Sequence, residues 1–448
     1  MKKFTLISTI LLFAVLSSFG QWEYTNLSEA KGQMGVAALG TKAYFAGGYK
    51  SGPLDKIEIY DVKTGEWRYW TLSAARILPI GVTCGSKVFF AGGAIFPTEF
   101  FSEVDIFDTV TQQWTVDYLS EPRFGLSAVS KGNKVLFAGG INLTTPTAAY
   151  NVVDIYDTET RDWTTNYLSQ PRGTMGSAVV GDLAIFAGGY DNQVTSDRVD
   201  IYNFTTGLWD TATLSESRGF VSATTIGNKV LIAGGFRDGF IPSNRVDIYD
   251  AVTNTWSIAE LSAPRCSENV FATVCGKAFY VGGGSFDGQY LNDPSDVIDV
   301  YDSVTNTWSV MNLTAPLVWH SVVAVGDKLL IAGGQSFLEG SGWFDQDLIS
   351  IYTNPDCIPQ GVVVHREKDS FFKIYPNPSS GNFQLEMLND NHQKPLLVTI
   401  YNLQGQEVFT QLMEPGNKVL NVNLPDGVYL LKVISDDATH AELIKIQK

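Results

Sequence analysis

The sequence is poor in the residue types from which most metal and catalytic sites are built. Its 448 residues include only four histidines and four cysteines, and 17% of them are charged. It contains no phosphate-binding loop, no HExxH zinc motif and no nucleophile elbow. The sequence therefore predicts no metal site, no cofactor and no catalytic residue that a motif would identify.

Basic residues are also scarce. The 31 lysines and arginines are outnumbered by 47 aspartates and glutamates, which gives a formal net charge of -16. Because phosphate binding requires clustered basic side chains, this balance argues against a nucleic-acid partner. With 44% hydrophobic residues the chain can still bury a large core, so we expect an acidic globular protein.

Long apolar runs are absent after the first twenty residues. Residues 1–20 combine Lys2 and Lys3, an apolar run over residues 4–15 and small residues near the end, a pattern typical of a secretory signal peptide. We expect the mature chain to begin at Gln21. A membrane anchor is the alternative, but this run is too short to span a bilayer and no later run reaches about 18 apolar residues. The mature chain is therefore expected to have no transmembrane segment.

What the sequence has in abundance is an internal repeat with a period of 45 to 52 residues. A Gly-Gly doublet begins at Gly47, Gly92, Gly139, Gly188, Gly234, Gly282 and Gly333, and a Trp follows at Trp67, Trp114, Trp163, Trp209, Trp256 and Trp308. Such a period indicates stacked repeats. Within each repeat, short alternating runs bounded by turn residues predict four strands, A to D.

The spacings show where the repeats differ. From each Trp to the next doublet the distance is 25 residues, except for one case of 26, whereas from doublet to Trp it ranges from 20 to 26. The variation therefore lies in the loop between strands B and C. Variable loops on a constant scaffold commonly carry binding residues.

The seventh repeat has no Trp of its own. Its strand C is predicted at residues 348–352, and Trp22 stands 25 residues before Gly47, which is the spacing of the other repeats. We therefore predict that a strand over residues 22–27 completes the last repeat. This pairing would close a ring over residues 21–354 and remove the exposed sheet edges.

Two positions change together from repeat to repeat. The residue that leads into strand A is Arg where strand C carries Asp, Lys where it carries Glu, and Leu where it carries Ser. The pairs are Lys31 with Glu58, Arg76 with Asp105, Arg123 with Asp154, Arg172 with Asp200, Arg218 with Asp247, Arg265 with Asp299, and Leu317 with Ser350. We predict an ion pair within each charged repeat, with a structural and not a ligand-binding role.

These repeats resemble the kelch family. The residues that carry the resemblance are the doublet, an aromatic residue such as Tyr156, and a Trp seven residues after it. The resemblance implies a seven-bladed β-propeller in which the B–C and D–A loops share one face. Kelch-type copper oxidases need paired histidines, but His320 is the only histidine in the repeats, and we expect it to be packed and hydrogen-bonded.

The four cysteines do not form the dense disulfide framework of a small secreted scaffold. Cys84 and Cys275 occupy the same position of different repeats, which places them in separate blades. Cys275 and Cys357 would lie on the same face of adjacent blades. A disulfide between these two residues is therefore a hypothesis.

Aromatic residues are frequent in the predicted loops. The candidate ligand-binding residues are Tyr49, Phe100, Phe101, Tyr190, Phe240, Tyr290, Trp343 and Phe344. Several share a loop with an Asp, and aromatic rings beside hydrogen-bonding acids suit a glycan or an extracellular protein. The alternative is that many of these rings fold down over the inner strands.

A different pattern follows the repeats. Residues 355–370 have the composition of a linker, and residues 371–448 contain short alternating runs that predict a small β-sandwich. This region resembles the type A sorting domain of the Bacteroidota type IX secretion system, through the motif Tyr375, Pro376, Asn377, Pro378 and Gly381 and through the segments 400–408, 427–430 and 445–448. The resemblance implies recognition by that secretion machinery and a secreted or outer cell-surface location. An accessory adhesive β-domain is the alternative.

Together these patterns predict an all-β protein, a seven-bladed kelch-like β-propeller followed by a small β-sandwich sorting domain. The expected function is a secreted or cell-surface binding module that recognises a glycan or protein partner through the propeller loops. An extracellular carbohydrate-active enzyme with carboxylates on the same face is the alternative function. A purely structural surface component is a third.

Overall fold

The computed structural model describes residues 21–267, 270–288, 291–338, 342–354, 357, 372–387, 396–401, 407–413, 419–434 and 439–447. The predicted signal peptide, the predicted linker apart from Cys357, and Tyr290 lie outside these residues. The chain divides into two compact units, residues 1–357 and 358–448. No helix in the described part is long and apolar enough to cross a membrane.

The first unit contains seven antiparallel sheets of four strands each, and each sheet is one blade. Blade 1 consists of β2 (Gly35–Leu39), β3 (Lys42–Ala46), β4 (Lys56–Asp61) and β5 (Trp67–Thr71), and blade 2 of β6 (Ile80–Cys84), β7 (Lys87–Ala91), β10 (Glu103–Asp108) and β11 (Gln113–Tyr118). Blade 3 consists of β12 (Ser127–Lys131), β13 (Lys134–Ala138), β14 (Val152–Asp157) and β15 (Trp163–Tyr167), and blade 4 of β16 (Gly176–Val180), β17 (Leu183–Ala187), β18 (Arg198–Asn203) and β19 (Trp209–Thr213).

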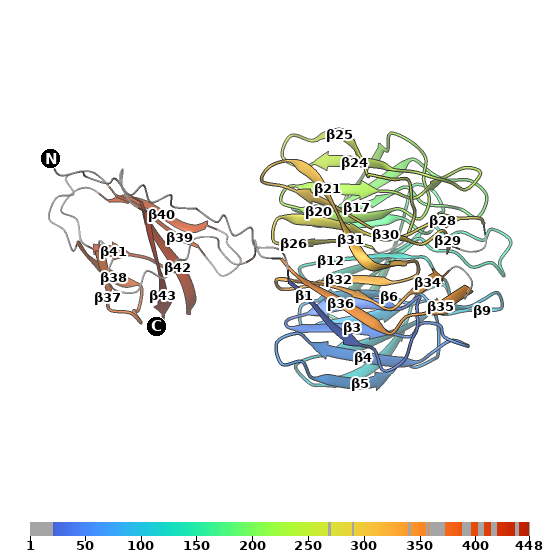
Figure 1. Cartoon of the computed structure of the whole chain (residues 1–448), viewed down its shortest axis with the longest axis horizontal. Coiled ribbons are helices and arrows are strands. Elements are labelled where there is room, and N and C mark those ends of the chain that lie inside the picture. Colours follow the sequence, from blue (N-terminus) through green and yellow to red (C-terminus); the bar gives the residue numbers. More distant parts are fainter. Residues whose placement is uncertain are drawn as a thin grey trace, which may run out of the picture. The chain divides into compact units, whose positions relative to one another are not determined.

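Blade 5 consists of β20 (Ser222–Ile226), β21 (Lys229–Ala233), β24 (Arg245–Asp250) and β25 (Thr255–Glu260), and blade 6 of β26 (Phe271–Val274), β27 (Lys277–Val281), β30 (Ser295–Asp302) and β31 (Thr307–Leu317). Blade 7 consists of β32 (Ser321–Val325), β33 (Lys328–Ala332), β36 (Leu348–Thr353) and β1 (Gln21–Asn26). The innermost strands contact one another in sequence order, and β32 of the last blade contacts β2 of the first. The sheets therefore form a closed seven-bladed propeller, which Figure 1 shows from its side. This confirms the predicted fold class.

Burial explains why the second strand of every blade is the most apolar. In β7 and β13 the last four residues are buried, because each of these strands has a neighbouring strand on both sides and a neighbouring blade on both faces. The outermost strands β11 and β15 contain only half-buried and exposed residues. The core consists of layers between blades, as where Phe89 meets Phe137 and Tyr156 with ring centroids 6.3 and 5.6 Å apart.

The last blade is completed by the N-terminal strand. β1 pairs with β36 in antiparallel register, with Trp22 opposite Tyr352. Their ring centroids lie 5.2 Å apart, close to the 4.9 Å between Tyr156 and Trp163 in blade 3. The N-terminal strand thus supplies the Trp that the seventh repeat lacks, as its spacing predicts.

The hypothesised disulfide between Cys275 and Cys357 is present, with their Cα atoms 5.1 Å apart. It joins the turn after β26 of blade 6 to the residues that follow β36 of blade 7. Cys84 and Cys266 are buried and take no part in a disulfide. The last described residue of the propeller is therefore held covalently.

The second unit has two sheets that share one apolar core. One sheet is β37 (Phe372–Tyr375), β38 (Asn382–Met387) and β41 (Val419–Asn421), and the other is β40 (Glu407–Met413), β39 (Leu396–Tyr401), β42 (Gly427–Ile434) and β43 (Thr439–Ile446). Phe383 and Leu420 from the first sheet pack with Val398 and Leu431 from the second. This is the arrangement of the predicted small sandwich.

The Tyr375–Pro376–Asn377–Pro378 motif begins at the last residue of β37 and lies on the surface. The Asn377 side-chain oxygen accepts a hydrogen bond of 2.8 Å from the Lys445 backbone N–H. The Gly381 amide lies in the same turn, where it donates to the Ser379 hydroxyl at 3.1 Å. The motif is therefore tied to the last strand of its own unit.

Candidate binding face

The B–C and D–A loops lie together at one end of the blades, and we call this surface the loop face. Among the described residues, four B–C loops contain a short hairpin: β8–β9 (Ala94–Ile95, Glu99–Phe100), β22–β23 (Phe236–Arg237, Ile241–Pro242), β28–β29 (Ser285–Phe286, Leu291–Asn292) and β34–β35 (Gln335–Leu338, Gly342–Asp345). Figure 1 shows several of them along one side of the propeller. The loops that vary most in length are thus partly ordered by their own hydrogen bonds.

Each D–A loop but one is held by a buried cation and a buried carboxylate. The pairs are Lys31–Glu58 at 2.8 Å, Arg76–Asp105 at 2.5 Å, Arg123–Asp154 at 2.7 Å, Arg172–Asp200 at 2.7 Å, Arg265–Asp299 at 2.5 Å, and Arg218–Asp247. All of these side chains are 4% exposed or less. These are the partners that covariation between the repeats predicts, and we call each pair an anchor.

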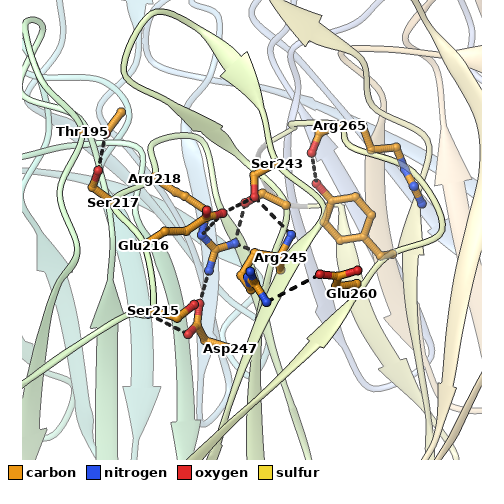
Figure 2. A network of polar contacts seen from close by, with 12 residues as sticks. Thr195, Ser215, Glu216, Ser217, Arg218, Ser243, Arg245, Asp247, Glu260 and Arg265 are labelled. Atoms are coloured by element: carbon orange, nitrogen blue, oxygen red, sulfur yellow. Dashed lines mark hydrogen bonds and ion pairs between the residues drawn. The ribbon is translucent and has the colours of Figure 1, made fainter.

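Blade 5 shows how an anchor fixes the loop (Figure 2). The Asp247 carboxylate accepts the Ser215 backbone N–H at 2.8 Å on one side and the Arg218 guanidinium on the other. The guanidinium also donates to the backbone carbonyls of Gly234 and Arg245, at 2.6 and 2.7 Å. One ion pair therefore fixes both the start of the D–A loop and the doublet of its own blade.

The same arginines also link neighbouring blades, which sequence reasoning missed. The Arg218 backbone carbonyl accepts a hydrogen bond of 2.8 Å from Gly189, in the doublet of blade 4. The carbonyl of Arg172 accepts in the same way from Gly140 of blade 3 at 3.0 Å. Each arginine thus contacts the previous blade through its backbone and its own blade through its side chain.

This arrangement explains the doublet. Gly139 and Gly140 have positive φ angles of 63° and 116°. A Cβ on Gly139 would lie 2.2 Å from the Arg172 carbonyl oxygen, and a Cβ on Gly140 would lie 2.9 Å from Cδ of Arg123. Only glycine leaves room here for the two arginines.

Burial and pairing act in opposite directions on the pKa values of the anchors. Burial lowers the pKa of the Arg123 guanidinium, and the charge of Asp154 counteracts this effect. For Glu58, burial would raise the pKa of the carboxyl, but the charge and hydrogen bond of Lys31 lower it on balance. The carboxylate is therefore favoured in its ionised form by its own cation.

Blade 7 has no anchor. Leu317 and Ser350 replace the charges, although the Leu317 carbonyl still accepts from Gly283 at 3.0 Å. His320 is buried beside this position, and its Nε2 lies 3.2 Å from the Val281 carbonyl, in line with the expected packed role. Burial lowers the pKa of His320 to about 4, so the ring is neutral at pH 7.

Most loop aromatics over blades 4 to 6 pack against one another. Tyr190 meets Phe236 with centroids 5.4 Å apart, and Phe236 meets Phe240, which meets Phe286, each at 5.4 Å. Phe220, in a D–A loop, lies 4.8 Å from Phe286. Tyr190 and Phe240 are therefore mainly packing residues of this cluster, which corresponds to the alternative of rings that cover the inner strands.

Phe101 does not belong on the candidate surface. Its side chain is only 6% exposed, and its ring centroid lies 5.8 Å from the Arg76 guanidinium carbon. The ring covers an anchor and is thus part of the interior. Phe100 is half-buried, with its ring 5.7 Å from that of Phe124.

Four loop aromatics remain exposed on the adjacent blades 7 and 1. Tyr49, Phe337, Trp343 and Phe344 are each between 40% and 47% exposed. Phe337 and Trp343 lie opposite each other in the β34–β35 hairpin, with ring centroids 5.5 Å apart. We call these four residues the closing-blade patch, because blade 7 is where the ring closes.

The acids of the loop face bind loop donors. Asp238 of blade 5 accepts two hydrogen bonds of 2.8 Å from Thr195 of blade 4, one from its backbone N–H and one from its hydroxyl. Asp345 accepts a hydrogen bond of 2.8 Å from the Gln335 side-chain amide.

The central channel holds a cavity of about 350 Å³ lined by the inner strands, and its lining has no titratable side chain among the described residues. The described part of the chain has no group of acids, histidines or cysteines arranged to bind a metal.

Comparison with known families agrees with this geometry. The sequence model described as the KLHDC2/KLHL20/DRC7 Kelch-repeats domain matches residues 33–217 and 125–334, which together span more than half of the chain. The chain belongs to the kelch-repeat family. Its propeller is therefore a kelch propeller by sequence as well as by topology.

The C-terminal unit matches a second family model, the Secretion system C-terminal sorting domain, over residues 373–447. This domain marks a protein that type IX secretion delivers outside the cell or to its outer surface. The kelch protein is thus a secreted binding module that the secretion machinery recognises through its C-terminal unit.

Among solved structures, the kelch protein is similar to one titled "Structure of YjhT", with 16% sequence identity and a TM-score of 0.49. The alignment covers 64% of this chain and 99% of the other. No curated protein matches the sequence.

Proposed function

We propose that the kelch propeller binds a glycan or an extracellular protein through its loop face, with the closing-blade patch as the contact surface. The observation that carries this proposal is the contrast in exposure between loops. Aromatic rings over blades 4 to 6 pack together, whereas those of the patch remain open to solvent. Exposed aromatic rings that cluster on one surface are typical of interaction sites.

The hairpin β34–β35 presents the rings of the patch in two directions. Residues that alternate along a strand point to opposite faces, so Trp343 and Phe344 cannot face the same way. Trp343 shares its face with Phe337, and together they offer one apolar surface. An exposed pair of aromatic rings of this kind suits either a sugar ring or a peptide segment.

The carboxylates of the loop face support binding over catalysis. A glycosidase requires two carboxyl groups on either side of a bond, one of them with a raised pKa. In the described loops Asp238 and Asp345 instead accept hydrogen bonds from neighbouring loop residues. We therefore assign these acids to the order of the loops.

The test is a screen of the purified mature protein against a glycan array and a library of extracellular proteins, with product analysis for every glycan that binds. Binding without turnover, reduced at least tenfold by Trp343→Ala and by Phe344→Ala, is the expected result. The control is Tyr167→Ala, which removes an aromatic ring with 60% exposure from the outer strand β15. Turnover would instead support the carbohydrate-active enzyme, and equal binding by all variants would exclude the patch.

A further inference from the structure

A cleft lies at the boundary between blades 1 and 2, at the end of the blades opposite the loop face. It has a volume of about 580 Å³, and its lining includes the A–B turns of both blades at Gly40 and Gly85. A–B turns and B–C loops lie at opposite ends of strand B, so this cleft is separate from the closing-blade patch. Its volume is within the range of sites that bind small ligands.

Two residues of β5, Arg68 and Trp70, give the cleft its chemistry. They stand opposite Ile59 and Ile57 of β4, and because side chains alternate along a strand, both face blade 2. Trp70 is 47% exposed, and its ring lies 6.5 Å from that of Phe107 on blade 2. The cleft therefore has an accessible indole next to a guanidinium.

The other blades have nothing comparable at these positions. The residues that correspond to Arg68 are Thr115, Thr164, Asp210, Ser257, Ser309 and Glu23, and those that correspond to Trp70 are Asp117, Asn166, Ala212, Ala259, Met311 and Thr25. In blade 2, for example, Asp117 accepts a hydrogen bond of 2.7 Å from the Trp163 indole of blade 3. A cation and an aromatic ring together are particular to blade 1, so the propeller scaffold does not require them.

The positive charge of the cleft is not neutralised by the protein. Lys42 also lines the cleft, but it pairs with Asp61 at 3.1 Å. Among the described residues, Arg68 has no carboxylate within ion-pair distance. Tyr44 and Arg68 both line the cleft. Burial raises the pKa of Tyr44 to about 12, and the charge of Arg68 counteracts this rise. In a protein with a net charge of -16, such a cation is a local site for an anion.

The lining also contains polar groups among its apolar residues. Thr41, Ser86 and Gln112 contribute two hydroxyl groups and an amide beside the indole. A sugar ring presents hydroxyl groups at its edge and C–H groups on its face, so it can hydrogen-bond to this lining and stack on Trp70 at once. A carboxylate on the ring would complement Arg68.

We propose that this cleft binds an acidic sugar residue of a polysaccharide, with its ring on Trp70 and its carboxylate on Arg68. The site is independent of the proposed loop-face function. It gives the secreted protein a second contact, directed to uronic-acid glycans, on the opposite end of the propeller.

The test uses the full mature protein with two probes, tetragalacturonate and its neutral methyl ester, and measures affinity by calorimetry and by quenching of Trp fluorescence. The wild type is expected to bind the acid at least tenfold more tightly than the ester. Arg68→Gln should remove this difference, and Trp70→Ala should weaken both probes at least tenfold. Added salt should weaken the binding of the acid but not that of the ester, because only the acid forms the ion pair with Arg68.

Matched controls come from the same face and the same strand. Arg161→Gln removes an exposed arginine from the corresponding end of blade 3, and Tyr69→Ala removes the exposed ring next to Trp70 that points to the other side of β5. Both should bind like the wild type. Equal effects of Arg68→Gln and Arg161→Gln, or no binding of either probe by the wild type, would overturn the proposal. Tighter binding of a poly-glutamate peptide in competition would show that the cleft takes acidic protein segments instead.

Discussion

Blade 7 differs from the other six blades in how its entering loop is held. Six D–A loops are held by a buried anchor, whereas blade 7 has Leu317 and Ser350 at the same positions. Blade 7 is also the blade whose outer strand comes from the N-terminus and whose last strand leads to the disulfide at Cys357. Six of the seven entering loops are thus held by a buried ion pair, and the seventh enters the blade in which the chain closes.

The comparison teaches that the anchor is one of several ways to fix the same loop. The inter-blade hydrogen bond to the doublet is kept in blade 7 without the charge, as the Leu317 carbonyl shows. In blade 6 the outer strand β31 continues as far as Leu317, where the other blades turn away earlier. The backbone contact is therefore the shared feature, and the ion pair is what stabilises it in the other six blades.

The largest expected effect comes from removing the closure. Deletion of residues 21–30 would remove β1 and the segment that connects it to Lys31. It would also expose β36 and the Tyr352 ring. The deletion removes the half-buried Trp22 ring and an entire strand of blade 7, so the thermal unfolding temperature should fall sharply. A truncated protein that melts like the full one would contradict the role of β1.

The next largest effect is expected from breaking one anchor. Asp200→Asn leaves the Arg172 charge buried without a counter-charge, which should lower the free energy of unfolding by about 3 to 5 kcal/mol. Ser350→Ala is the matched control in blade 7, where no charge is left behind, and about 1 kcal/mol or less is expected. Urea denaturation of both variants measures the contrast between the blades.

The disulfide sharpens the comparison on the side of blade 7. Cys275 and Cys357 are 82 residues apart in sequence, and a closed loop of this length stabilises a fold by about 4.5 kcal/mol in the chain-entropy account. Cys357→Ser should lower the unfolding temperature, and a reductant should lower that of the wild type to the same value. Peptide mapping that is unchanged by reductant would show that the bond does not form.

The smallest expected effect is a pH dependence of the free energy of unfolding that comes from His320, beside blade 7. His320 is neutral in the fold, with a pKa of about 4, whereas the unfolded chain has an ordinary histidine pKa of about 6.5. The unfolded state therefore binds more protons between these values. The contribution of His320 to stability is complete above pH 6.5 and falls by about 3 kcal/mol as the pH drops to 4.

The measurement is the difference in unfolding free energy between wild type and His320→Gln as a function of pH. The difference should shrink as the pH falls from 6.5 to 4, because only the wild type has to neutralise the histidine. A difference that stays constant over this range would mean that the His320 pKa is not lowered.

Much of the fold was predictable because the repeats serve as an alignment within one chain. The doublet, the Tyr and the Trp fix the strands, and Trp22 fixes the closure. The partner of each arginine was predictable for the same reason, since charge changes at both positions together. The hydrogen bond between each arginine carbonyl and the previous blade was not predictable, because every residue type has a backbone carbonyl.

The candidate surface was less predictable, because an aromatic residue in a loop can point either way. Phe101 and Trp343 have the same kind of sequence context, yet one covers Arg76 and the other is exposed. The cleft at Arg68 was missed because it forms between two blades. The signal available was the contrast of Arg68 and Trp70 with the same positions of the other repeats.

A double-mutant cycle in blade 4 tests most directly the claim that each anchor acts as one unit. Arg172→Leu and Asp200→Ser together copy the residues of blade 7. The account predicts that each single variant loses about 3 kcal/mol or more, and that the double variant loses at least about 2 kcal/mol less than the sum of the two. Additive losses would contradict it, because they would mean that the two charges stabilise the loop independently.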